Sequence, residues 1–279
     1  MTAVKADAFR YDGKRALVVG GATGMGAATA QLVQELGGDV IAMDYAPVQY
    51  EVGATVQLDL RDRHSIDAAV DACEGTVDAL FSCAGVADGT PGIERINFIG
   101  HRHLIDRAIA TGILGRGAAI GMISSAAGLG WETNLELVKE YLDTPDFDAA
   151  VDWIAAHPDK ADYMFSKQAI CTYVAREALN MLKRGIRINA ILPGPTDTPL
   201  AQANVDVWLG FGSDYRAEAG IEASRPDEQA AVLAFLCSDA ASYLSGQTVI
   251  TDAGYVAAGI TGAFPAATPL VNLLSGREA

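Results

Sequence analysis

The fold of this chain is most strongly indicated by the segment Arg15-Ala16-Leu17-Val18-Val19-Gly20-Gly21-Ala22-Thr23-Gly24-Met25-Gly26. It begins with a short apolar run, Arg15–Gly20, typical of a buried strand, and continues into helical periodicity over Gly24–Leu36. Glycines between a strand and a helix let backbone N–H groups approach a pyrophosphate at the positive end of the helix. A tight turn without a ligand would use the same residues. The segment therefore predicts a strand–turn–helix unit and a candidate dinucleotide site.

The carboxylate of Asp44 supports the dinucleotide interpretation. Gly20, Gly24 and Gly26 have the spacing G-x-x-x-G-x-G, which differs from the fingerprint G-x-G-x-x-G. Asp44 comes at the end of the second predicted strand, where a carboxylate can bind the ribose 2′-hydroxyl of the cofactor. The same charge would repel a 2′-phosphate, and neither of the next two residues is basic. The sequence therefore favours NAD(H) over NADP(H).

Apolar runs alternate with segments of helical periodicity along the whole chain. We predict strands at Arg15–Gly20, Asp39–Met43, Ala54–Leu58, Val77–Cys83, Ala118–Ile123, Ile186–Leu192 and Gln247–Thr251. We predict helices at Gly24–Leu36, Ser65–Cys73, Ile93–Ala110, Asp162–Lys183 and Asp227–Cys237. Strands that are apolar on both faces and separated by helices indicate a parallel sheet covered on both sides. We therefore expect one α/β domain over residues 1–279, with a Rossmann-type, doubly wound parallel sheet.

Two segments interrupt this alternation. Residues 129–160 precede the longest predicted helix and look like an inserted pair of helices. Thr133-Asn134-Leu135-Glu136 fits a capping box for the first of them, and Thr144-Pro145 starts the second. Residues 195–222 form a long connection rich in proline, glycine and aromatic residues, which is typical of a functional lid. We assign this connection as a substrate loop.

The C-terminal tail, residues 255–279, lies mostly in an uncharged stretch between Asp252 and Arg277. That stretch is about long enough to span a bilayer. It is interrupted by prolines and glycines and is only mildly apolar, so we expect it to pack on its own fold or on a neighbouring subunit. No membrane partner is predicted.

The overall composition argues against several other classes of protein. The chain has 20 basic and 35 acidic side chains and a formal net charge of −15, which repels a phosphate backbone, so no nucleic-acid partner is expected. The four cysteines form no CxxC pair and indicate buried thiols in a reducing compartment. The first eleven residues contain no apolar signal segment. We therefore expect a soluble, cytoplasmic protein.

The segment Tyr163-Met164-Phe165-Ser166-Lys167 carries the strongest indication of chemistry. A tyrosine and a lysine four residues apart share one face of a helix. A phenol has an ordinary pKa of about 10, and a neighbouring cation lowers it. The pair is a weak signal alone, but the glycine turn, Asp44 and the upstream pair Ser124-Ser125 give it context.

Taken in order, these motifs resemble the short-chain dehydrogenase/reductase family from about Lys14 to Tyr255, and most of all its bacterial 3α-hydroxysteroid dehydrogenase/carbonyl reductase branch. The glycine turn is similar to the family's T-G-x-x-x-G-x-G, with Val19 in place of the threonine. Further similar segments are Pro193-Gly194 with Thr198, Ser245-Gly246-Gln247 and Asp252-Ala253-Gly254. Ser82-Cys83-Ala84-Gly85 stands where Asn-Asn-Ala-Gly is typical, which leaves open how the end of the fourth strand is braced.

The resemblance implies a set of site residues and the cofactor NAD. The catalytic residues would be Asn97, Ser125, Tyr163 and Lys167. The cofactor would be bound by Gly20, Thr23, Gly24, Met25, Gly26, Asp44, Asp59, Leu60, Ala84, Gly85, Tyr163, Lys167, Pro193, Gly194, Thr196 and Thr198. Asp59 corresponds to the acid that holds the adenine amino group. No metal is implied.

The resemblance also implies hydride transfer between a secondary alcohol and the nicotinamide. Tyr163 would be the general base in oxidation and the acid in reduction, with its pKa lowered by Lys167 and by the positive nicotinamide ring. Ser125 would hydrogen-bond the substrate oxygen. Lys167 would also hold ribose hydroxyls, and Asn97 would anchor a water that relays protons.

His101 and His103 are the one pair of residues that suggests a metal. Two residues apart on a helix, they point in different directions, and no carboxylate or thiol cluster accompanies them. We therefore expect them on a helix surface or at an interface.

The predicted substrate is a bulky hydrophobic alcohol or ketone, such as a steroid, a terpenoid or another alicyclic compound. The interval between Ser125 and Tyr163 is longer than in most family members. Apolar walls are expected from Leu129, Trp131, Trp208, Leu209, Phe211 and Tyr215. The same side chains could instead cover the core or a subunit contact. The family's usual oligomers imply a homo-oligomer, dimer or tetramer, in which residues 129–160 either extend or block the contact between subunits.

Two rival functions remain. A non-catalytic dinucleotide-binding sensor would keep the fold without turnover, although the set Ser125, Tyr163 and Lys167 argues against it. An acyl-thioester or sugar reductase would call for basic or polar residues around the pocket, of which the substrate loop offers only Arg216.

Overall fold

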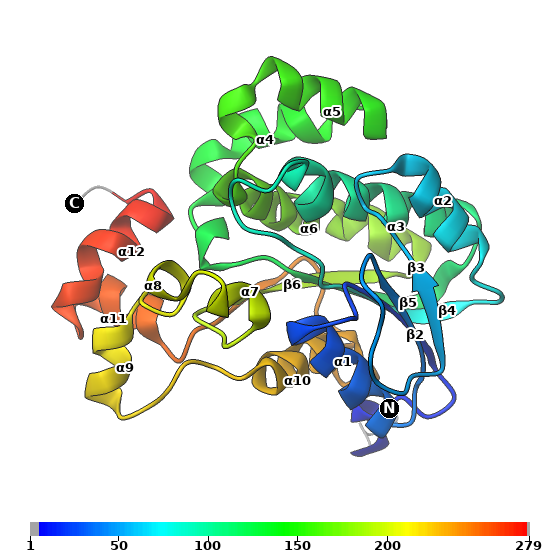
Figure 1. The fold of residues 1–279 in the computed structure, drawn as a ribbon, viewed down its shortest axis with the longest axis horizontal. Coiled ribbons are helices and arrows are strands. Elements are labelled where there is room, and N and C mark those ends of the chain that lie inside the picture. The colour runs from blue at the N-terminus through cyan, green and yellow to red at the C-terminus, as the bar shows by residue number, and fades with distance from the viewer. Residues whose placement is uncertain (1–5, 278–279) are drawn as a thin grey trace.

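The computed structural model describes residues 6–277, which fold around one sheet of seven parallel strands (Figure 1). The strands are β1 (Arg15–Val19), β2 (Asp39–Asp44), β3 (Ala54–Gln57), β4 (Val77–Ser82), β5 (Leu114–Ile123), β6 (Arg187–Pro193) and β7 (Thr248–Thr251). Their spatial order is β3-β2-β1-β4-β5-β6-β7. The chain therefore builds outward from β1 in one direction and from β4 in the other. Between these two strands the connections diverge, and a crevice opens at their carboxyl ends.

Helices cover both faces of the sheet, as Figure 1 shows. One face is covered by α1 (Gly24–Glu35) and α10 (Pro226–Cys237), and the other by α2 (Arg63–Asp71), α3 (Gly100–Ala110) and α6 (Tyr163–Arg184). Each face has its own buried apolar cluster, because the strands present branched side chains to both sides. The predicted single-domain, doubly wound α/β fold is confirmed.

The predicted helix Ile93–Ala110 differs from the observed one in its first turns. Residues Arg95–Ile99 form a π-helical turn, and regular α3 begins only at Gly100. A side chain at Gly100 would meet the Leu60 carbonyl at 2.5 Å, so the glycine lets the start of α3 press against the segment after β3. Single π-helical turns are frequent at functional sites.

Residues 129–160 form the two predicted helices, α4 (Leu135–Leu142) and α5 (Phe147–Ala156), but the predicted capping box is wrong. Thr133 lies in a 3-10 turn, Trp131–Asn134, and its hydroxyl donates to the Gly130 carbonyl instead of capping α4. The second helix starts two residues later than Thr144-Pro145 indicated, because the Asp146 carboxylate accepts from the Ala149 N–H at 2.9 Å.

The two helices of this segment pack on α6 and on the π-helical turn. The buried side chains of Tyr141 and Phe147 join the same apolar cluster as Phe98, Phe165 and Tyr173. Arg102 of α3 donates to the Thr144 hydroxyl and carbonyl and to the Asp146 carbonyl, which fastens the α4–α5 connection.

The substrate loop and the tail lie together beside this core (Figure 1). The loop contains three short helices, α7 (Pro199–Gln202), α8 (Val205–Trp208) and α9 (Ser213–Ala219), and the tail contains α11 (Tyr255–Thr261) and α12 (Thr268–Ser275). Their shared apolar cluster includes Phe211, Tyr215, Tyr255, Val271 and Leu129. Among residues 6–277 no single helix is long and apolar enough to cross a bilayer; α11 with Pro265–Ser275 reaches the required length and composition only as a pair bent by 94°.

Candidate active site

Two adjoining cavities open at the carboxyl ends of the strands. The first, of about 400 Å³, lies over the glycine turn and the end of β2. The second, of about 410 Å³, lies over the start of α6 and under the substrate loop. Each predicted cofactor residue lines one or both of these cavities. Met25, Cys83, Gly85, Thr198 and Leu200 line both and form the boundary between them.

The glycines of the turn are required by close backbone packing. Gly20 has a φ of 83°, and a Cβ there would lie 2.4 Å from the Ala84 nitrogen. A Cβ on Gly26 would lie 1.9 Å from the Gly20 carbonyl oxygen. Gly24 differs, since its φ is 57° and its nearest neighbour, Thr198, is 3.5 Å from the Cβ position. The turn is therefore pressed against the end of β4, beneath the first cavity.

The start of α1 can hold an anion. Thr23 precedes the helix, and its side chain makes no capping hydrogen bond. The first turn of α1 contains no acidic residue that would neutralise the positive end of the helix. This part of the turn lines the first cavity, so its free N–H groups and the Thr23 hydroxyl fit the pyrophosphate of a dinucleotide.

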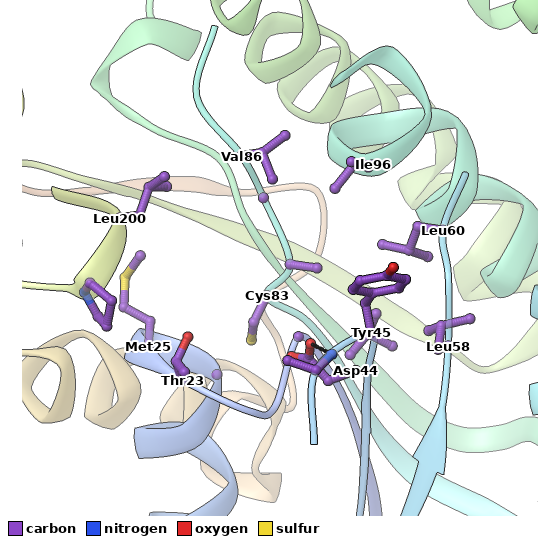
Figure 2. A pocket seen from close by; sticks show the side chains of 18 of the residues that line it. Thr23, Met25, Asp44, Tyr45, Leu58, Leu60, Cys83, Val86, Ile96 and Leu200 are labelled. Atoms are coloured by element: carbon purple, nitrogen blue, oxygen red, sulfur yellow. Dashed lines mark hydrogen bonds between the residues drawn. The ribbon is translucent and has the colours of Figure 1, made fainter. Parts of the chain in front are cut away.

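Asp44 lies where the sequence placed it, at the end of β2. Figure 2 shows it with Tyr45 between the turn that carries Thr23 and a wall formed by Leu58 and Leu60. Its two oxygens accept from the N–H groups of Ala22 and Ala46, each at 2.9 Å. Each carboxylate oxygen has a second lone pair, so Asp44 retains two acceptor sites for ribose hydroxyls.

Arg61 is a residue of this cavity that the sequence analysis missed. Its guanidinium binds the Asp59 carboxylate through both oxygens, with 2.7 Å between Nη2 and Oδ2, and its carbon lies 5.0 Å from the Tyr45 ring centroid. The hydrogen bonds from Arg61 lower the pKa of Asp59. Arg61 is the one cationic side chain among the described residues that line this cavity. Its spacing of two residues from an acid is too common to have identified it.

Ser125, Tyr163 and Lys167 meet on the wall of the second cavity. Tyr163 is the first residue of α6, which begins there because the Asp162 carboxylate accepts from the Phe165 N–H. Lys167 is one turn further along, with its Nζ 5.3 Å from the centroid of the Tyr163 ring. Lys167 is 3 % exposed, and its ammonium donates to the Ile123 carbonyl at 3.0 Å, its one hydrogen bond to the described residues. The remaining N–H donors of this buried group fit the ribose hydroxyls of a cofactor.

The electrostatics of this group differ from the expectation. Burial raises the pKa of Tyr163 above its ordinary value, the hydrogen bond with Ser125 lowers it, and the charge of Asp88 raises it further. Burial also lowers the pKa of Lys167 to about 8. Without a cofactor, desolvation is the largest influence on the pKa of the phenol, and the expected lowering by Lys167 together with the nicotinamide ring stays a prediction.

Asn97 lies behind the cavities and lines neither of them. It is fully buried in the π-helical turn, where its Oδ1 accepts from the Val86 N–H at 2.8 Å. Its Nδ2 donates to the Val86 carbonyl at 3.1 Å and to the Ser166 hydroxyl at 3.2 Å. Asn97 thus ties the segment after β4 to α6, and one lone pair of Oδ1 remains for a water.

The surface or interface position expected for His101 is wrong. Its side chain is buried at the start of α3, with Nδ1 2.6 Å from the Ser82 hydroxyl and Nε2 3.0 Å from the Ala84 carbonyl. His103 points elsewhere and lies 2.9 Å from the Asp67 carboxylate. The neighbours of His101 lie far from it in sequence, so helical periodicity alone could not reveal them.

The walls of the second cavity are only partly those expected. Trp208 and Phe211 line it, and the Tyr163 ring packs edge-on against Trp208 at 4.8 Å. The other expected wall residues are absent from the lining, namely Leu129, Trp131, Leu209 and Tyr215. Leu129 and Tyr215 pack instead against the tail. The lining residues that were missed include Leu274 from α12 and Asp88, whose Oδ1 accepts from the Tyr163 N–H at 2.6 Å.

The chain is similar in sequence to known proteins. Residues 14–135 match the family model described as short chain dehydrogenase, and residues 149–256 match that of enoyl-(acyl carrier protein) reductase. The chain is 28% identical to coniferyl-alcohol dehydrogenase of Pseudomonas sp. over 86% of its length and 96% of the relative's. It is 30% identical to 3-alpha-hydroxysteroid dehydrogenase/carbonyl reductase of Comamonas testosteroni, over 85% and 95% of the two chains.

The fold is also similar to that of a dehydrogenase of known structure. The 3-alpha-hydroxysteroid dehydrogenase from Pseudomonas sp. B-0831, complexed with NADH, superimposes with a TM-score of 0.71 and 27% identity, over 90% of this chain and 99% of that one. The sequence comparison and the fold comparison agree. The chain therefore belongs to the short-chain dehydrogenase/reductase family of oxidoreductases, which act on CH–OH groups.

Proposed function

We propose that this protein interconverts a secondary alcohol and a ketone with NAD(H), and that its substrate is a bulky hydrophobic or alicyclic molecule. One observation carries the proposal: Ser125, Tyr163 and Lys167 gather on the wall of a largely apolar cavity that adjoins the dinucleotide cavity. A substrate in the second cavity would thus have its oxygen beside the phenol and its reacting carbon toward the first cavity.

The residues of the first cavity would hold the cofactor along the carboxyl ends of β1, β2 and β4. The start of α1 with Thr23 would bind the pyrophosphate and Asp44 the adenosine ribose, while Lys167, on the wall of the second cavity, would bind the other ribose. When bound, the nicotinamide supplies or takes up the hydride. Pro193, Gly194 and Thr196 line the second cavity, where they would position the carboxamide end.

Tyr163 would handle the proton. In oxidation its phenolate oxygen takes the hydroxyl proton of the substrate, and in reduction the phenol returns it. Ser125 would donate a hydrogen bond to the substrate oxygen as charge develops on it. Because burial raises the pKa of the phenol, positive charge in the cleft is needed to bring it toward neutral pH, and the buried Lys167 ammonium is one source.

The preference for NAD over NADP is supported by the charges of the first cavity. Asp44 provides a carboxylate at the ribose position, which opposes a 2′-phosphate. Arg61 could attract such a phosphate, but its guanidinium is already neutralised by the two oxygens of Asp59. To bind a 2′-phosphate, Arg61 would have to give up its hydrogen bonds to Asp59.

The substrate class is supported by the lining of the second cavity. Leu200, Val207, Trp208, Phe211 and Leu274 make it apolar, while Asp88 and Lys167 are the charged groups among its described residues. A phosphopantetheine-linked thioester would need cations at the mouth, and Asp88 supplies the opposite charge. An acyl-thioester reductase, the activity named by the family model that matches residues 149–256, is therefore the weaker proposal.

Initial rates with NAD⁺ and NADP⁺ on a panel of cyclic alcohols, from cyclohexanol to a hydroxysteroid, test this function. We expect the highest kcat/KM for a multi-ring alcohol with NAD⁺. Tyr163→Phe should lower kcat by about 10²–10⁴-fold while NADH still binds. Tyr243→Phe, a change at a fully exposed tyrosine, is the matched control. NADH binding without oxidation of any alcohol would instead support a dinucleotide sensor.

Two further predictions concern the intact protein. A homo-oligomer remains our proposal for its assembly, and sedimentation equilibrium tests it. A cytoplasmic location is proposed likewise, and fractionation of cells that express the tagged chain tests that.

A further inference from the structure

The end of β4 is braced differently from the family's Asn-Asn-Ala-Gly pattern. Ser82 and Cys83 replace the two asparagines, and the buried imidazole of His101 reaches this segment from the first turn of α3. Its two nitrogens contact the Ser82 hydroxyl at 2.6 Å and the Ala84 carbonyl at 3.0 Å. One side chain therefore fastens the last residue of the strand and the residue two positions beyond it.

The partners of His101 determine its tautomer. A carbonyl can only accept, so Nε2 must carry the hydrogen that is donated to Ala84. In a neutral ring Nδ1 is then the acceptor, and the Ser82 hydroxyl donates to it. Burial, with a smaller contribution from Lys167, lowers the pKa of His101 to about 4 even though the Ala84 hydrogen bond raises it. The imidazole is thus neutral at physiological pH and fully satisfied.

The bond to Ala84 fixes the orientation of the next peptide group. The Ala84–Gly85 peptide is trans, so the Gly85 N–H points opposite to the Ala84 carbonyl and hence away from His101. Gly85 lines both cavities, and no described residue accepts a hydrogen bond from its N–H. On the other side, the Ala84 nitrogen lies 2.4 Å from where a Gly20 side chain would begin. That nitrogen belongs to the preceding peptide, so Ala84 packs directly on the glycine turn at the point where the Ala84–Gly85 peptide begins.

We propose that His101 is a positioning residue for dinucleotide binding. Its hydrogen bond to the Ala84 carbonyl keeps the Gly85 N–H directed at the cofactor and keeps the Ala84 backbone packed against Gly20. The proposal rests on dinucleotide binding at the first cavity, but not on the identity of the alcohol. His101 itself touches neither cavity, so it acts through the backbone of the β4 end.

Two conservative substitutions separate the two hydrogen bonds of the ring. The amide nitrogen of His101→Gln can take the place of Nε2 and keep the bond to Ala84. The shorter amide of His101→Asn reaches only the position of Nδ1, next to Ser82. Ser82→Ala provides the complementary loss, and His103→Gln is a matched control on the same helix, directed at Asp67. Thermal unfolding of each variant verifies that it is folded.

Fluorescence titration with NADH and with NADPH gives the decisive readout, using the dinucleotide that the unsubstituted chain binds more tightly. His101→Asn should raise its Kd by about tenfold, the effect of one lost hydrogen bond. His101→Gln, Ser82→Ala and His103→Gln should stay within about threefold of the unsubstituted protein. With an alcohol that is turned over, KM for the dinucleotide should rise in His101→Asn while kcat changes less.

Nitrogen-15 NMR of labelled histidines provides a second readout that is independent of binding. The chain has four histidines, so substitution of each assigns its signal. His101 should show the neutral Nε2–H form at pH 6. Equal Kd values for folded His101→Asn and His101→Gln, a protonated ring at that pH, or no dinucleotide binding by the unsubstituted chain would each overturn the proposal. Failure to oxidise alcohols with normal NADH binding would instead defeat only the proposed function.

Discussion

The two cavities are built in different ways. The dinucleotide cavity is formed mostly by the segments that follow β1, β2, β3 and β4, within the first hundred residues, and is completed by Thr198–Leu200. The substrate cavity takes its walls from α6, the loop 195–222 and α12, which are separated along the chain and meet only after folding. The first cavity depends on glycines such as Gly20 and Gly26, where a side chain would collide with neighbouring backbone. In the second cavity one lining side chain can be shortened while the backbone around it stays in place. A substitution that changes a cavity wall should therefore weaken binding more in the first cavity than in the second.

The largest effect is expected from Gly26→Ala on the dinucleotide side. The new methyl group would lie 1.9 Å from the Gly20 carbonyl oxygen, so the turn or the end of β4 must move. We expect a loss of several kcal/mol in the free energy of unfolding, and NADH binding weakened by more than about 100-fold. Urea unfolding and NADH titration measure the two. Gly13→Ala, at a positive φ of 73° but with no atom within 4 Å, should cost only about 1 kcal/mol.

The next effect concerns the pH dependence of stability, which follows from the burial of His101 behind the same cavity. Its pKa is lowered to about 4 in the folded protein, against an ordinary value of 6.5, so the unfolded chain binds the proton first. This contribution to stability is complete above pH 6.5 and is lost as the pH falls to 4, by about 3 kcal/mol. Urea unfolding across this range should show a shallower decline in His101→Gln. Parallel curves for the two proteins would show that the ring is not held neutral.

A moderate effect is expected on the substrate side from Leu274→Ala. Leu274 of α12 lines the second cavity, whereas its neighbour Leu273 is 74 % exposed and provides a matched control. Loss of the wall should raise KM for a multi-ring alcohol by about five- to tenfold, with little change for cyclohexanol or in the Kd for NADH. Equal effects of Leu273→Ala and Leu274→Ala would place the tail outside the substrate site.

The same contrast explains what the sequence could predict. The parallel strands, the glycine turn and Asp44 follow from short local patterns whose backbone geometry is nearly obligatory, so their predicted positions lie within a few residues of the observed ones. Tyr163 and Lys167 were found from their four-residue spacing, and Ser125 from the resemblance to the family. Their convergence on one cavity follows from the parallel sheet, whose carboxyl ends share one edge.

Side chains that act across the fold were missed. His101 was assigned to a surface because its partners, Ser82 and Ala84, lie on another element. Leu129 and Tyr215 were assigned to the substrate walls, yet they are turned toward the tail cluster. Thr133 does not cap α4, because its hydroxyl donates to the Gly130 carbonyl within a 3-10 turn. In each case a tertiary contact overrode a valid local preference.

The smallest effect should come from Asp88→Asn, at the mouth of the substrate cavity. The asparagine oxygen can still accept from the Tyr163 N–H, now bonded to Asp88 Oδ1 at 2.6 Å, so the start of α6 keeps its position. Only the negative charge is lost, and that charge raises the pKa of the Tyr163 phenol. Oxidation requires the phenolate, so the rising limb of the rate–pH profile should move to lower pH, with rates on that limb up by about two- to threefold. Asp206→Asn, on the exterior of the loop, is the control.

Salt distinguishes a charge effect of Asp88 from a change of position. Asp88 is exposed, so its interaction with the phenol is screened by solvent and ions. At about 0.5 M NaCl the profiles of the unsubstituted protein and Asp88→Asn should therefore converge, whereas a displaced Tyr163 would leave them apart at every ionic strength. An increase in KM for the alcohol without any shift of the profile would assign Asp88 to the cavity wall alone. Convergence would show that the charge of Asp88, which the fold places beside the first residue of α6, sets the pKa of Tyr163 in the second cavity.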